Sequence, residues 1–100
     1  MTIQFNTDKN IHGTEKVTEP LIEIIQQELS RYSDKITRIE VHLSDEDGNK
    51  DGFKDKRCLL EARLKGRKPI AVTNMANTHL LAVEGAIDKL KSSMGKLLND

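Results

Sequence analysis

The group of side chains best suited to chemistry is a run of basic residues near the middle of the chain. Between Lys50 and Lys68 there are eight Lys or Arg and three Asp or Glu, a net charge of +5. Such a segment can bind a polyanion even on a neutral protein, because phosphate contacts are made locally. The alternative is a solvated, charged hairpin without a polyanion partner, and composition alone favours that alternative.

The charge of the whole chain hides this segment. Its 100 residues contain 16 basic and 16 acidic side chains. Residues 1–49 carry a net charge of −5 and residues 50–100 a net charge of +5. This length predicts one domain over residues 1–100 with a modest core, which argues against a large enzyme with a deep pocket.

Nothing in the sequence indicates a membrane or a secretory route. No apolar run approaches the roughly 20 residues of a membrane span, and the polar start over residues 1–10 does not resemble a signal peptide. Cys58 is the only cysteine, which excludes a disulfide within the chain. We therefore expect a cytoplasmic protein without a membrane partner.

Catalytic and metal-binding motifs are missing from the sequence. It has no Gly-rich phosphate loop followed by Lys-Ser or Lys-Thr, and its three His lie on a predicted loop, strand and helix start. Cys58 falls on an inward strand position and is expected to be a small buried hydrophobic residue. The run Asp45-Glu46-Asp47 lacks the spacing of a calcium loop, so we expect a solvated turn. These absences predict no metal, no cofactor, no small-molecule substrate and no enzymatic activity.

Hydrophobic periodicity predicts the element order β-α-β-β-β-α. Strict alternation indicates half-buried strands, as in Ile39, Val41 and Leu43. The first helix is expected to begin at Thr18-Glu19-Pro20, because Pro is tolerated in a first turn. The expected ranges are a strand over 2–6, a helix over 18–33, strands over 36–44, 56–65 and 69–73 with a long turn over 45–55, and a helix capped by 77–78.

Two amphipathic helices and a four-stranded sheet with one apolar face predict an α+β fold, a two-layer sandwich with both helices on one face. The apolar stripe of the second helix is expected to be core. Its members are Leu80, Val83, Ile87, Leu90, Met94 and Leu97.

The scarcity of aromatic residues constrains how this chain could bind RNA. Phe5, Tyr32 and Phe53 are its only aromatic residues, whereas base stacking needs aromatic platforms on an exposed face. We therefore expect phosphate contact and shape recognition. The candidate donors lie on the hairpin and strands (Lys56, Arg57, Arg63, Lys65, Arg67, Lys68) and on the second helix (Lys89, Lys91, Lys96).

Three segments together resemble the ribosome hibernation factors, the HPF/RaiA group also called sigma-factor-modulation proteins. The first is Asp-Lys-Ile-Thr-Arg-Ile-Glu-Val-His-Leu-Ser over residues 34–44. The second is Glu-Ala-Arg-Leu-Lys over residues 61–65, and the third is Ala-Val-Glu-Gly-Ala-Ile-Asp-Lys-Leu over residues 82–90. The resemblance implies the same β-α-β-β-β-α fold.

The resemblance also implies a function. Family members bind the small ribosomal subunit under stress, occupy the channel of mRNA and tRNA, and stop translation through basic contacts to ribosomal RNA. Four basic residues match basic places in the family pattern: Arg38, Arg63, Lys65 and Lys89. This chain departs from the pattern at Thr78 and Leu80, at Ser92-Ser93, and in its longer turn over residues 45–55.

A second interpretation belongs to another class. The chain could be a divergent protein-interaction module that keeps the fold without binding ribosomes, with its acidic N-terminal half and the turn over 45–55 as the contact surface. The sequence also leaves homodimerisation open, through an edge strand and an exposed Leu59.

Overall fold

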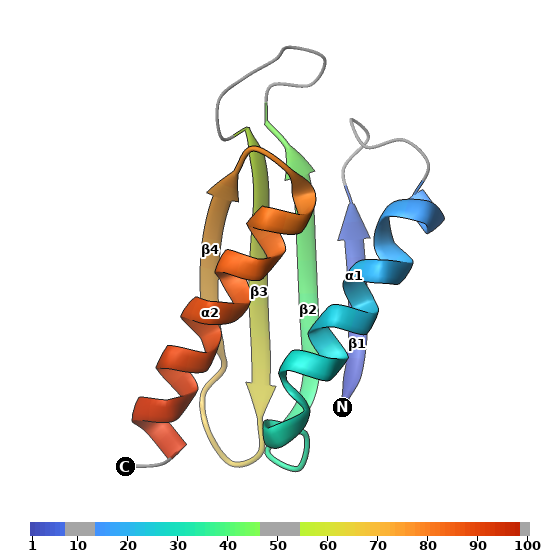
Figure 1. Ribbon diagram of the computed structural model, residues 1–100. Helices are drawn as coiled ribbons and strands as arrows, with labels where there is room; N and C mark the ends of the chain where they lie inside the picture. Colours follow the sequence, from blue (N-terminus) through green and yellow to red (C-terminus); the bar gives the residue numbers. More distant parts are fainter. Residues whose placement is uncertain (8–13, 47–54, 99–100) are drawn as a thin grey trace.

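The computed structural model describes residues 1–7, 14–46 and 55–98, and both helices lie on the same face of a four-stranded sheet (Figure 1). The elements are β1 (Thr2–Thr7), α1 (Thr14–Glu28), the short 3-10 helix η1 (Ser30–Tyr32), β2 (Ile36–Asp45), β3 (Lys56–Leu64), β4 (Ile70–Ala76) and α2 (His79–Leu98). The predicted α+β two-layer sandwich and its element order are confirmed.

The sheet has the order β1-β2-β3-β4. β1 runs parallel to β2, with α1 as the crossover connection, and the other two pairs are antiparallel. The register aligns one apolar row across all four strands, formed by Phe5, Val41, Leu60 and Val72. Val41 and Leu60 are completely buried, because this row faces the helix layer. The inward and outward alternation predicted for β2 and β3 is confirmed.

A close approach between α2 and β4 fixes the second helix on the sheet. The Asn74 side-chain amide donates to the carbonyls of Leu81 and Ala82, at 3.4 and 3.2 Å. A Cβ atom at Gly85 would lie 2.1 Å from Asn74 Nδ2. Gly85, which costs roughly 1 kcal/mol of helix propensity relative to Ala, is therefore needed for this contact.

The first helix begins earlier than predicted. α1 starts at Thr14, before the predicted start at Thr18, and Pro20 lies inside the helix. Proline has no amide N–H, so residue 20 donates no hydrogen bond to the carbonyl of Lys16. Lys16 lies in the first turn of α1 and is exposed to solvent. Pro20 was therefore a poor marker of the first turn.

The predicted β4 was also too short. It runs to Ala76, because Asn74, Met75 and Ala76 continue the antiparallel pairing with Cys58, Arg57 and Lys56. The cap predicted for α2 is confirmed, since Thr78 Oγ1 accepts a hydrogen bond from the Leu81 amide at 3.1 Å.

Two members of the predicted apolar stripe of α2 are not core. Leu80 is 44% exposed and Leu97 is 41% exposed. Leu80 lies in the first turn of α2, on the same side of the helix as Ile87, which lines a groove shared with α1. Leu97 lies in the last turn, which passes beyond the β4 edge because α2 crosses the sheet diagonally (Figure 1).

The ends of the predicted solvated turn are packed. Asp45 is the last residue of β2 and only 8% exposed, and Asp55 is 3% exposed. Lys56 Nζ lies 2.9 Å from Asp55 Oδ1 and 3.4 Å from Asp45 Oδ2, which compensates the two buried carboxylates. The rest of the predicted turn, residues 47–54, lies outside the described residues.

Candidate nucleic-acid interface

The turn between β3 and β4 presents basic side chains at one end of the sheet. Lys65, Arg67 and Lys68 are all exposed. Gly66 makes this tight turn with a φ of 68°, a conformation that glycine adopts without a steric penalty. The Lys65 amide donates to the carbonyl of Lys35 at 3.0 Å, which joins the turn to the segment before β2.

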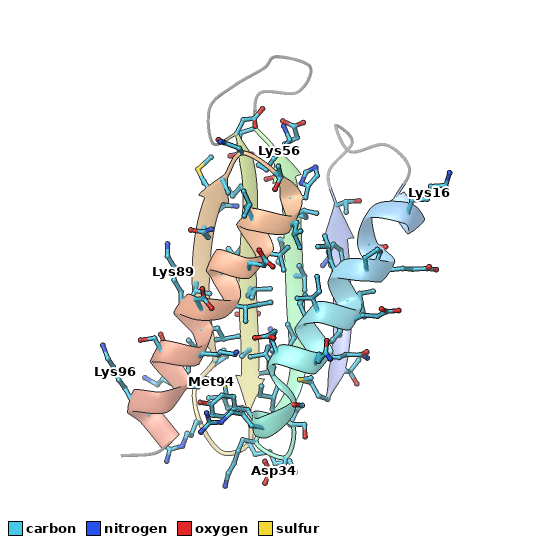
Figure 2. All side chains as sticks on the ribbon, in the orientation of Figure 1. Lys16, Asp34, Lys56, Lys89, Met94 and Lys96 are labelled. Carbon is cyan, nitrogen blue, oxygen red and sulfur yellow. The ribbon has the colours of Figure 1, made fainter. Side chains whose placement is uncertain are left out.

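This contact brings two further cations to the same end. Lys35 is exposed, and its amide donates to the carbonyl of Tyr32 at 2.9 Å. The Arg31 guanidinium lies 5.0 Å from the centroid of the Tyr32 ring, which is itself buried and holds the η1 segment in place. We define the basic end as Arg31, Lys35, Lys65, Arg67 and Lys68. Figure 2 labels Asp34, an exposed acidic residue at the same end.

Sequence reasoning missed Arg31 and Lys35, because both belong to the acidic half of the chain. The signal that could have found them is the predicted antiparallel pairing of β2 with β3. That pairing places the start of β2 beside the end of β3, and Ile36 pairs with Leu64.

Two predicted donors of the outer sheet face, Arg38 and Arg63, are compensated by carboxylates. Arg38 Nη2 lies 2.6 Å from Glu40 Oε2, and Arg63 Nε lies 3.5 Å from the same oxygen. Arg63 also lies 3.4 Å from Glu61. Arg57 projects from the same face of β3 and is half-buried. Arg38 and Arg63 therefore share the Glu40 carboxylate and do not form a simple basic patch.

The predicted lysines of α2 point in two directions. Lys89 and Lys96 project on the same side of the helix, as predicted from their spacing (Figure 2). Lys89 Nζ donates to the carbonyl of Thr73 on β4 at 2.8 Å. Lys91 Nζ instead pairs with Glu28 of α1 at 2.5 Å. These contacts tie α2 to its neighbours on both sides.

Among the predicted donors, Lys56 is paired with two buried carboxylates. Hydrogen bonding to the Asp55 carboxylate raises the pKa of Lys56; burial opposes this shift by a smaller amount, and Asp45 raises the pKa further. The ammonium stays charged, but two carboxylates face it. The ten predicted donors therefore fall into three groups of three and one single residue. They are Lys65, Arg67 and Lys68 of the basic end, Arg38, Lys56 and Arg63 paired with carboxylates, Lys89, Lys91 and Lys96 of α2, and Arg57 on β3.

Cys58 and the acidic side chains offer no second chemistry. Cys58 is completely buried, and burial raises the pKa of its thiol to about 12, which confirms the expected buried hydrophobic role. Over residues 1–7, 14–46 and 55–98, no three His, Cys, Asp or Glu side chains gather in a way that could hold a metal ion. In the same part of the chain, no helix is long and apolar enough to cross a membrane.

Comparison with known proteins identifies the family. Residues 7–99 match the family described as sigma 54 modulation protein / S30EA ribosomal protein. The chain belongs to this family. The resemblance found in the three sequence segments is thereby confirmed, and so is the prediction that the chain is not an enzyme, because the family is one of ribosome-associated modulation factors.

Two solved structures share the fold of this family member. A ribosomal subunit interface protein from Coxiella burnetii matches with a TM-score of 0.76 at 17% identity, covering 100% of both chains. The N-terminal domain of Protein Y from Thermus thermophilus matches with a TM-score of 0.73 at 22% identity, covering 97% of this chain and 99% of that one. No curated protein sequence matches the chain.

Proposed function

We propose that this protein is a ribosome-associated translation inhibitor that binds RNA of the small subunit in the channel for mRNA and tRNA. The observation that carries the proposal is the basic end, five exposed cations gathered from two halves of the chain, in a member of the S30EA ribosomal protein family. The name of the similar Coxiella burnetii protein, a ribosomal subunit interface protein, supports the same role.

The basic end suits a phosphate backbone better than individual bases. Its side chains are long cations on a turn and a short helix, and the neighbouring aromatic residue, Tyr32, is buried under Arg31. Lys and Arg then contact phosphates and recognise the shape of folded RNA without reading sequence. A protein seated in the channel excludes mRNA and tRNA by occupying their volume, so translation stops without any covalent step. Storage of ribosomes under stress, in the cytoplasm, follows from this role.

The test is co-sedimentation of the purified protein with small subunits and whole ribosomes at low and moderate salt. We expect stoichiometric association with the small subunit that weakens as salt rises. Each neutralised phosphate contributes about 0.7–0.9 to the slope of log affinity against log salt concentration, so engagement of the whole basic end gives a slope of about 4 in magnitude.

Matched charge reversals localise the contact. Arg67→Glu lies in the basic end, whereas Lys16→Glu changes an exposed cation near the start of α1, at the opposite end of the molecule (Figure 2). We expect the first variant to bind markedly more weakly and the second to bind like the wild type. Absence of association at low salt would contradict the proposal and favour the alternative, a protein-interaction module that keeps the fold.

A further inference from the structure

A groove between the two helices has a chemistry opposite to that of the basic end. It has a volume of about 350 Å³ and is lined by residues of both helices: Ile24, Gln27, Glu28, Glu84, Ile87 and Asp88. Its apolar part comes from Ile24, which is half-buried and packs against the core, and Ile87, which is 1% exposed. Three exposed carboxylates, Glu28, Glu84 and Asp88, stand around this apolar part.

The carboxylates of the groove are unequally compensated. Glu28 is paired with Lys91, which reaches across from α2. Glu84 and Asp88 have no ion pair with any residue of the described part of the chain. The groove therefore carries net negative charge, although α2 belongs to the basic half of the sequence.

The apolar surface continues along α2 beyond the groove. Leu80 lies one turn before Glu84 and two turns before Ile87, so it extends the same side of the helix. Its 44% exposure leaves a large apolar side chain open to solvent next to the acidic rim. Exposed apolar surface beside a rim of net negative charge suits the apolar and cationic faces of an amphipathic helix.

We propose that this groove binds a Lys- and Arg-rich amphipathic helix of a partner protein. Apolar side chains of that helix would cover Leu80 and the half-buried Ile24, and its cations would pair with Glu84 and Asp88. Nucleic acid does not suit the groove, because its phosphates would meet the same carboxylates. The inference goes beyond the proposed ribosome binding, which rests on the basic end, and it uses different residues.

The test uses a defined probe, an 18-residue helical peptide of Leu and Lys with one apolar face. We expect its addition to the ¹⁵N-labelled full chain to shift backbone amide resonances of α1 and α2 around Ile24, Glu84 and Ile87. A peptide with Glu in place of every Lys should produce no such shifts. A peptide with the same composition but scrambled order, which lacks the apolar face, should bind at least about 5-fold more weakly.

Two pairs of variants with equal change in net charge separate groove binding from general attraction. Glu84→Gln with Asp88→Asn removes carboxylates from the groove, and Glu19→Gln with Glu23→Gln removes exposed carboxylates of α1 that do not line it. Because two rim ion pairs are worth about 1–1.5 kcal/mol in total, we expect the groove variant to lose roughly 5- to 10-fold in affinity. The α1 control should lose less than 2-fold. Leu80→Ser leaves the net charge unchanged and should also weaken binding of the peptide.

Three results would overturn the inference: no shifts at millimolar peptide, equal losses in the groove and control variants, or shifts of the groove amides with an RNA oligonucleotide in place of the peptide. None of these experiments contains ribosomes. Failure of the groove inference therefore leaves the proposed function untouched, and failure of co-sedimentation leaves the groove inference untouched.

Discussion

Glu40 Oε2 lies 2.6 Å from Arg38 Nη2 on the outer face of the sheet. The same oxygen lies 3.5 Å from Arg63 Nε on the neighbouring strand, and the Glu40 side chain is only 15% exposed. One carboxylate thus holds two guanidiniums from neighbouring strands. This arrangement orders both Arg side chains and at the same time offsets their charge toward an approaching phosphate.

Removing this carboxylate should make the sheet face more basic. We expect Glu40→Gln to raise affinity for the small subunit about 2- to 5-fold and to steepen its salt dependence by about 1, since a released guanidinium can neutralise one more phosphate. Glu23→Gln, an exposed carboxylate of α1, is the matched control and should have little effect. Co-sedimentation over a salt series measures both. Equal affinity for Glu40→Gln and the wild type would show that the outer sheet face does not contact RNA.

Lys35 tests the part of the basic end that the sequence did not reveal. We expect Lys35→Glu to weaken association with the small subunit about 10-fold, as Arg67→Glu should. The hydrogen bond from the Lys65 backbone amide to the Lys35 carbonyl places Lys35 at the same end as the β3–β4 turn. Binding of Lys35→Glu that equals the wild type, alongside a defect in Arg67→Glu, would restrict the interface to the β3–β4 turn.

The strands were predictable because their burial pattern is local. Ile39, Val41 and Leu43 alternate with polar residues, and a period of two has one interpretation in a half-buried strand. The start of α1 was harder to predict from the sequence, because Pro20 is compatible with several positions near the beginning of a helix. The exposure of Leu80 depends on how far apart two helices lie, which local periodicity does not encode.

The sequence shows which residues of the candidate site are cations. It does not show which of these cations are paired with a carboxylate in the folded chain. Arg38 and Glu40 alternate on one strand, so their pairing could have been anticipated from spacing. The approach of Lys56 to Asp45 depends on the β2–β3 register, and the contribution of Arg31 depends on the whole topology.

The Asn74–Gly85 contact should be visible in stability. We expect Gly85→Ala to lower the free energy of unfolding by about 1–3 kcal/mol, because the added Cβ would lie 2.1 Å from Asn74 Nδ2. Gly95→Ala is the matched control, because a Cβ there meets nothing within 4 Å, and it should stabilise by up to about 1 kcal/mol through helix propensity. Urea denaturation followed by circular dichroism measures both. In an Asn74→Ala background the cost of Gly85→Ala should shrink, and an undiminished cost would contradict the proposed steric origin.

Burial of Cys58 should make alkaline pH destabilising. The thiol pKa is about 12 in the folded chain against 9.0 for the free group, so only the unfolded state loses the thiol proton between these values. Below pH 9 the neutral thiol costs nothing, and above it the free energy of unfolding falls by about 1.4 kcal/mol per pH unit until about pH 12. Cys58→Ala removes this contribution, so the difference in free energy of unfolding between the two proteins, measured by urea denaturation, should change with pH only above pH 9.

At pH 8 the Cys58 thiol of the folded chain should react with a disulfide reagent at least about 100-fold more slowly than the thiol of the chain unfolded in guanidinium chloride. Rapid labelling of the folded protein would contradict the buried, neutral thiol.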